Sequence, residues 1–139
     1  MSVRDLKNNV EREFALYEVI TSDGSTTGQP VIDTADYDSG VMFDFFATVW
    51  SAGSVYPEIL QSEDDGATDP YTTVDPDVNL IGTIADATVS AAITPNDPIP
   101  TLGVVGNKRY LKLIGRGQGG ANMTYVATVS KVPEVRPVS

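Results

Sequence analysis

Residues 41–50 read VMFDFFATVW, and this stretch decides the fold class. Apolar and polar positions alternate with period two, and aromatic and β-branched residues dominate, so the pattern predicts a β-strand. One face would carry Val41, Phe43, Phe45, Ala47 and Val49, and the other Met42, Asp44, Phe46, Thr48 and Trp50. Both faces hold large apolar groups, which is typical of a strand that is covered on both sides or lies at an interface.

Further strands are expected on either side of this one, separated by turn residues. The candidates are residues 14–20, 31–34, 56–62, 87–94, 109–114 and 123–130. The glycine-rich residues 115–120 read as a hairpin connection between the last two, and Pro57 indicates an edge or a bulge. Residues 63–79 read as a long polar loop. The sequence therefore predicts an all-β protein with a single antiparallel β-sandwich or barrel-like domain.

The N-terminus has a different pattern. Val3, Leu6, Val10 and Phe14 recur at spacings of three and four, which predicts a short helix over residues 2–14. Three turns are marginal in isolation, so this arm needs a surface to lie on. That surface is either the protein's own domain or a neighbouring protein. The expected organisation is an N-terminal helical or extended arm at 1–13, a β domain at 14–132 and a tail at 133–139.

Composition excludes several classes of protein. The chain has 139 residues, which suits one domain, and contains neither cysteine nor histidine. Disulfide scaffolds, thiolate or imidazole metal sites, cysteine nucleophiles and serine triads of the common type are therefore excluded. No apolar run approaches the roughly 18 residues of a membrane helix, and no secretory signal is expected. We expect a protein that is not an enzyme, has no cofactor and binds no membrane.

Acidic and basic residues are separated along the chain. The net charge of −10 comes from 19 acidic and 9 basic residues, and residues 14–107 contain no Lys or Arg. Either the acids only keep the domain soluble, or an acidic body stays in solvent while basic ends contact a partner. So negative a body disfavours nucleic acid. The cluster Lys108, Arg109, Lys112 and Arg116 is expected to neutralise acids within the fold.

Motifs for chemistry are weak. Two acidic groups could in principle bind calcium: Asp33, Asp36 and Asp38, and Glu63, Asp64, Asp65 and Asp69. Neither has the EF-hand spacing, and Asp favours turns by bonding its own backbone. A small sandwich rarely forms the cleft that a carboxylate-based hydrolase needs. Trp50 is expected to pack in the core, with a sugar-binding platform as the alternative reading.

The order of several short motifs resembles a known family. The motifs are DYDSGV at 36–41, LQSEDDG at 60–66, LIG at 80–82, VGNKRYLKL at 105–113, and a tail with Pro133 and Pro137. Over roughly residues 31–139 this succession is similar to small structural proteins of tailed bacteriophages, regarded as capsid decoration or cement proteins. The loop after residue 66 and the proline-rich residues 95–100 depart from the pattern.

The resemblance implies a protein made in the host cytoplasm that binds the outside of the virion and stabilises contacts between capsid subunits. The expected partners are the major capsid protein and other copies of the chain, as a trimer or alternatively a dimer. A tail or head-appendage module that binds carbohydrate or the host surface is the alternative. The expected capsid or subunit contacts are Val3, Arg4, Leu6, Lys7, Val10, Arg12, Phe46 and Trp50.

Overall fold

The computed structural model describes residues 11–21, 24–35 and 40–131 and shows an all-β fold, as the sequence predicts. One antiparallel sheet contains every strand. The strands are β1 (Glu11–Ile20), β2 (Val31–Asp33), β3 (Val41–Ser62), β4 (Thr72–Thr73), β5 (Leu80–Ile81), β6 (Thr101–Val104) and β7 (Tyr110–Lys131). Over these described residues the sheet does not close into a barrel, because it has separate edge strands at β1 and β5.

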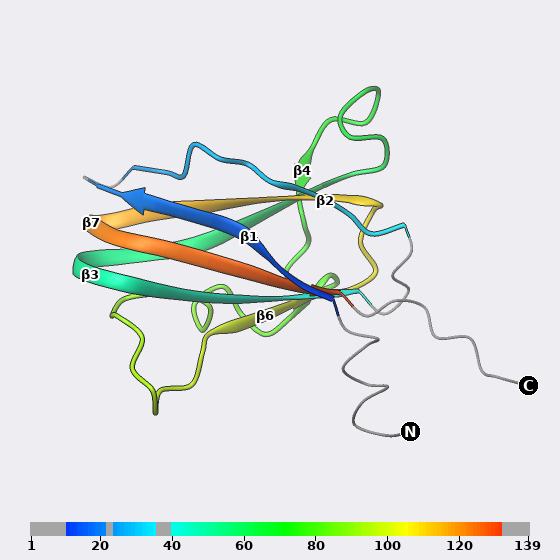
Figure 1. The fold of residues 1–139 in the computed structure, drawn as a ribbon. Coiled ribbons are helices and arrows are strands. Elements are labelled where there is room, and N and C mark those ends of the chain that lie inside the picture. The colour runs from blue at the N-terminus through cyan, green and yellow to red at the C-terminus, as the bar shows by residue number, and fades with distance from the viewer. Residues whose placement is uncertain (1–10, 22–23, 36–39, 132–139) are drawn as a thin grey trace, which may run out of the picture.

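Two long strands build both layers of the molecule. β3 and β7 pair with each other from Val41–Lys131 at one end to Ser62–Tyr110 at the other, and both bend midway. Figure 1 shows the two strands running side by side and turning back together. The halves beyond the bend lie over the first halves, so a single sheet folds into a sandwich-like domain.

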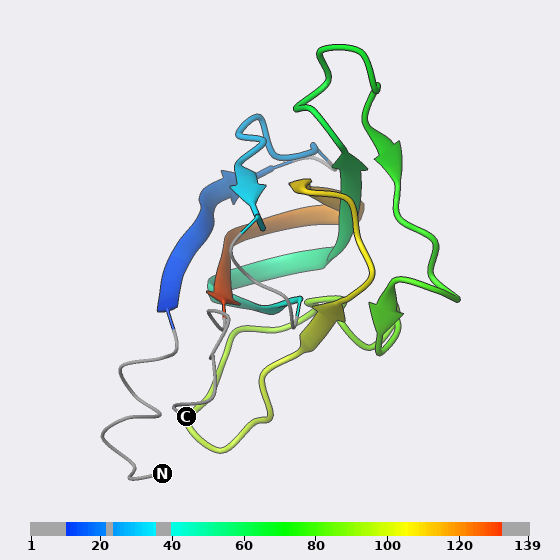
Figure 2. The ribbon, with the colours of Figure 1, turned by 90° about the vertical axis from the view of Figure 1, so that its right-hand side faces the viewer.

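The remaining strands extend each layer. The first layer has the order β1–β7–β3–β6–β5, and it uses the N-terminal half of β3 and the C-terminal half of β7. The second layer has the order β2–β7–β3–β4 and uses the opposite halves. Seen from the side, β1 lies at one flank of the molecule, and β4 and β5 lie at the other (Figure 2).

The core lies between the layers and follows the predicted alternation over residues 41–47. Val41, Phe43, Phe45 and Ala47 are all buried. The ring of Phe45 stacks between those of Phe43 and Tyr125, with centroid distances of 6.0 and 6.2 Å. Burying such rings is a main source of the stability of a small domain.

The structure corrects two predicted strand boundaries. Residues 41–50 and 56–62 belong to one strand, β3, with irregularities in pairing between Ala47 and Ser54. Residues 115–120 are not a hairpin connection but part of β7, which runs through them. Glycines in this segment allow a bulged strand as readily as a turn, and the neighbouring β3 provides the pairing that favours the strand.

Two other predictions are wrong. Residues 11–14 are not helical, because β1 begins at Glu11 and pairs antiparallel with β7, starting at Glu11–Lys131. The rest of the predicted helix lies outside the described residues. Residues 87–94 form no strand. They make only isolated bridges, Ala92 to Ala47 and Val89 to Val55, although Ala87 and Val89 are buried as an inward face would be.

Candidate functional site

The outward surface of the first layer is apolar across three neighbouring strands, and we call it the outer face. It comprises Phe14, Tyr17 and Val19 of β1, Met42, Asp44, Phe46 and Val49 of β3, and Thr124, Val126 and Thr128 of β7. Successive side chains of a strand point to opposite sides of a sheet. The positions between these residues, such as Phe43 and Tyr125, fill the core.

The outer face is built around Val126. Tyr17 of β1 and Phe46 of β3 both pair with Val126, one from each side. Val126 points away from the core, yet only 1% of it is exposed. Directly paired side chains lie about 5 Å apart, so the three residues form one continuous apolar row.

A second row continues the apolar surface. Val19 and Val49 both pair with Thr124, the next outward position of β7. Both valines are 63% exposed, and Phe14 at the other end of β1 is 72% exposed. Soluble proteins expose scattered apolar residues, but a contiguous group is typical of an interaction surface.

The outer face also differs from the rest of the molecule in charge. Its one charged residue is Asp44, whereas residues 14–107 as a whole carry fifteen carboxylates. Acidic side chains gather instead on the turns, in particular at residues 63–69. A partner that approaches the outer face therefore meets an apolar surface with little charge to desolvate.

Phe46 and Trp50 are the predicted contact residues whose side chains the structure describes. Phe46 is on the outer face and partly buried. Trp50 does not pack in the core as predicted: it is 38% exposed at the bend of β3, and its indole Nε1 donates a hydrogen bond to Gly53 O at 2.9 Å. Irregular pairing between Ala47 and Val49 also places Val49 outward, not inward as the alternation predicts.

The other predicted contacts are in the N-terminal arm. Arg12 lies in β1, where its backbone pairs with Ser130. Its side chain is outside what the structure describes. The remaining ones, Val3, Arg4, Leu6, Lys7 and Val10, lie outside the described residues. Sequence reasoning missed Tyr17, Val19 and Val126. The signal for the first two was available, because large apolar residues occupy both faces of residues 14–20.

The predicted neutralisation of acids by the late basic cluster is confirmed for three residues. Lys108 pairs with Asp69 at 2.9 Å, Arg109 with Asp33 at 2.9 Å, and Arg116 with Glu58 at 3.1 Å. Arg116 binds both carboxylate oxygens of Glu58, and this contact raises the pKa of the guanidinium. The fourth cation differs, since Lys112 Nζ lies 4.3 Å from the ring centroid of Tyr71.

The acidic loop considered for calcium uses its carboxylates internally. Asp64 accepts hydrogen bonds from the amide and hydroxyl of Thr68 and from the amide of Asp69. The Thr68 hydroxyl and the Asp69 amide lower the pKa of Asp64 to about 2. Asp65 accepts a bond from the Tyr71 hydroxyl. Across residues 11–21, 24–35 and 40–131 no three potential ligand residues gather as a metal site would require, and Asp36 and Asp38 lie outside these ranges.

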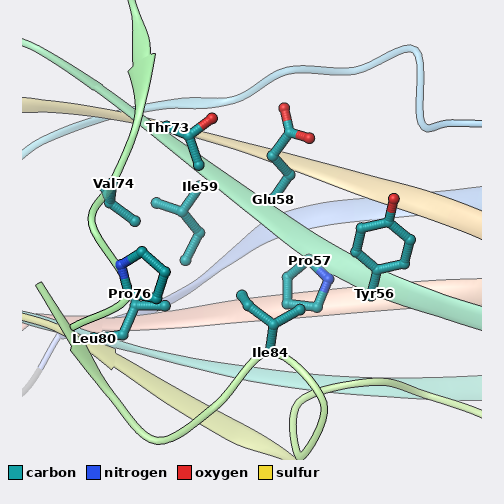
Figure 3. Close-up of a pocket in the computed structure, with 9 residues that line it drawn as sticks. All are labelled: Tyr56, Pro57, Glu58, Ile59, Thr73, Val74, Pro76, Leu80 and Ile84. Atoms are coloured by element: carbon teal, nitrogen blue, oxygen red, sulfur yellow. The ribbon is translucent and has the colours of Figure 1, made fainter.

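A small apolar pocket opens at the other flank of the sandwich, between the second half of β3 and residues 73–84 (Figure 3). Its volume is about 180 Å³. The lining residues are Tyr56, Pro57, Glu58, Ile59, Thr73, Val74, Pro76, Leu80 and Ile84. Ile59 O accepts a bond from Val74 N, whereas Pro57 has no amide hydrogen to offer at this edge. The carboxylate of Glu58 is held by Arg116, so the pocket suits an apolar group.

No model of a known protein family matches the chain, and no curated protein matches its sequence. In the described part of the chain, no helix has the length and apolar character needed to cross a membrane.

Proposed function

We propose that this protein is a structural component of a virus particle that binds the outside of a tailed-phage capsid through its outer face. The observation that carries the proposal is the row Tyr17–Val126–Phe46, an apolar surface on an otherwise acidic body. The family resemblance of residues 31–139 supplies the capsid as the partner. On the particle, the major capsid protein would cover this face while the acidic turns remain in solvent.

The proposed role is to stabilise contacts between capsid subunits. Such a role needs a firmly shaped body rather than a reactive site. The fold provides one, because β3 and β7 are paired along both layers, and the ion pair Arg116–Glu58 also links the two strands in the second layer. Many copies on one particle add their binding energies, so a modest contact per copy is sufficient.

The outer face can be tested with particles that lack the protein. Val49→Asp places a charge on the proposed contact, in the row next to Tyr17–Val126–Phe46, and we expect binding to capsids in a co-sedimentation assay to weaken at least tenfold. Burying an unpaired carboxylate against a partner costs several kcal/mol or keeps the partner away.

The matched control for this test is Val78→Asp. Val78 is exposed to a similar extent, 67% against 63% for Val49, but it belongs to the turn after β4 at the other flank. The control is expected to bind as the unmodified protein does and to protect capsids against heat equally well. If both variants bind capsids equally well, the outer face is not the surface that contacts the capsid.

The N-terminal arm remains a predicted second contact, with a capsid subunit or with another copy of the chain. Since β1 begins at Glu11, the deletion that tests the arm removes residues 2–10 and leaves the strand whole. If the shortened protein melts as before but loses capsid binding, the arm is a docking element. If it unfolds or aggregates, the arm belongs to the domain.

One observation favours the alternative of a head-appendage or tail module that binds carbohydrate. Trp50 is partly exposed at the bend, and exposed indole rings can stack on sugars. Binding to a glycan array that Trp50→Ala abolishes, together with unchanged capsid binding in that variant, would support a carbohydrate role. If the unmodified protein binds no glycan on the array, the carbohydrate alternative is rejected and capsid binding is the remaining proposal.

A further inference from the structure

β1 differs from the other edge strands of the sheet in its length. β2 has three residues, and β4 and β5 have two each, whereas β1 has ten. Proteins keep exposed edges short because unpaired backbone groups attract other strands. Over the described residues, the backbone of β1 pairs with β7 only, which leaves its second edge available along the flank seen in Figure 2.

β1 has two of the features that protect open edges, a bulge between Phe14 and Leu16 and an inward-pointing charge at Glu18, but its sequence, EREFALYEVI, has few of the others. It contains no Lys, Pro or Gly, and three of its four charged residues are at its first end. The fourth, Glu18, belongs to the inward face with Leu16. Its carboxylate accepts hydrogen bonds from Thr27 N at 2.7 Å and Gly28 N at 2.9 Å. The outward positions from Phe14 onward are therefore uncharged.

We propose that β1 pairs with β1 of a second copy, antiparallel about a twofold axis at Tyr17. The two-residue period of a strand restricts the choice of axis, because a shift by one residue places outward side chains opposite inward ones. An axis between two residues has this fault. An axis at Glu18 would place two glutamates opposite each other, which is unfavourable. An axis at Tyr17 instead places Glu18 opposite Leu16 of the partner copy, and both belong to the inward face. Ala15 is the extra residue of the bulge in β1, so Phe14 then lies opposite Val19 of the partner copy, and both point outward.

This pairing fixes the number of copies in the assembly. When two identical edges pair about a twofold axis, neither edge is left unpaired for a third copy, so the assembly closes with two copies. The sequence predicts a trimer, with a dimer as the alternative, and this geometry favours the dimer. The first layers of the two copies would form one continuous sheet, with both outer faces on the same side. The pairing needs no capsid and stands on the strand geometry alone.

A cysteine placed at the axis tests the proposal directly, because the natural chain has none. Opposed residues of antiparallel strands have Cα atoms about 4.5–5.5 Å apart, within the roughly 4.4–6.8 Å of a disulfide. We expect Tyr17→Cys at tens of micromolar to form a covalent dimer under mild oxidation, as detected on a non-reducing gel. The control is Val49→Cys, which is equally exposed on the same face but two strands away from the edge. It should cross-link at least tenfold more slowly.

Sedimentation of the unmodified chain completes the test. A dimer that Tyr17→Lys converts to a monomer, with an unchanged circular dichroism spectrum, supports edge pairing. A monomer at all concentrations overturns it. Faster cross-linking at Val49 than at Tyr17 would also overturn it, in favour of packing between outer faces. Since no capsid is present in these experiments, a negative result leaves the capsid-binding proposal to its own test.

Discussion

Gly53 of β3 and Ala121 of β7 approach so closely at the bend of the sheet that a β-carbon at position 53 would lie 2.5 Å from Ala121 N. Gly53 also has a positive φ of 69°, and its carbonyl accepts the indole hydrogen bond of Trp50. The bend that turns one sheet into two layers therefore depends on the absence of a side chain at this position.

Gly53→Ala is predicted to destabilise the fold by about 3 kcal/mol or more, since backbone strain and a clash with backbone atoms add together. Gly120→Ala is the control: Gly120 has a similar φ of 75°, but an added β-carbon meets nothing within 4 Å. It should cost only the strain of about 1–2 kcal/mol. Thermal melts of both variants give the comparison, and equal losses would show that the close approach is unimportant.

Phe43→Ala should reduce the free energy of unfolding by about 3–5 kcal/mol, because the ring is fully buried and its loss leaves a cavity. The neighbouring Met42 points to the outer face and is 51% exposed, so Met42→Ala should cost under about 0.5 kcal/mol. Urea unfolding measures both values. A small effect at Phe43 would contradict the inward face of β3.

Tyr125→Phe is expected to raise the melting temperature. Tyr125 is buried in the core, and its hydroxyl has no hydrogen-bond partner among the described residues. A buried polar group without a partner costs about 1–3 kcal/mol, and burial also raises the pKa of this phenol. Phenylalanine keeps the stacking on Phe45 and removes the hydroxyl, for a gain of about 1 kcal/mol. A clear loss of stability would indicate that the hydroxyl is satisfied by an internal water.

The acidic loop predicts a pH dependence. The pKa of Asp64 is about 2 in the folded protein, below its ordinary value of 3.8. The folded state thus stabilises the ionised form of the Asp64 carboxylate relative to the unfolded state. The resulting stability is present above pH 3.8 and is lost as the pH falls through 2. Asp64→Asn should therefore lower the melting temperature at pH 6, and the difference from the unmodified protein should shrink toward pH 2.

Thr68→Val provides the control for this pH effect. It removes the hydroxyl, which is the largest cause of the lowered pKa, while keeping the backbone amide. The midpoint of the Asp64 carboxyl titration, followed by carbon NMR, should move up toward 3.8 in this variant. A midpoint at 3.8 in the unmodified protein would disprove the proposed hydrogen-bond network.

Local alternation predicted the long strand segments and most of their buried face, but not every strand. Residues 41–47 and 123–130 follow period two, and their inward positions, from Phe43 to Tyr125, form the core as expected. Residues 87–94 also alternate but form no strand. The continuity of β7 through residues 115–120 could not be predicted in this way. Glycines fit a turn and a bulged strand equally well, and the choice depends on β3, which is distant in sequence.

The candidate site, too, was predictable from local sequence only in part. Phe46 was identified from its own strand, but the row that it forms with Tyr17 and Val126 needs the register of three strands. The helix predicted over residues 2–14 is wrong over residues 11–14 for a related reason. A stripe at helical spacing is a local signal, and pairing of β1 with β7 outweighs it because the strand gains a ladder of backbone bonds.

The shared use of β3 and β7 by both layers has a consequence for how the chain folds and unfolds. Neither layer can melt alone, because loosening either one frees half of each long strand, so unfolding should be a single cooperative transition. β3 and β7 can pair only after the intervening residues 63–109 have been synthesised and have folded back so that the two strands meet. Such non-local pairing is typical of domains that fold in milliseconds to seconds, slower than helical proteins of similar size. A newly made chain therefore reaches its folded form in one late step.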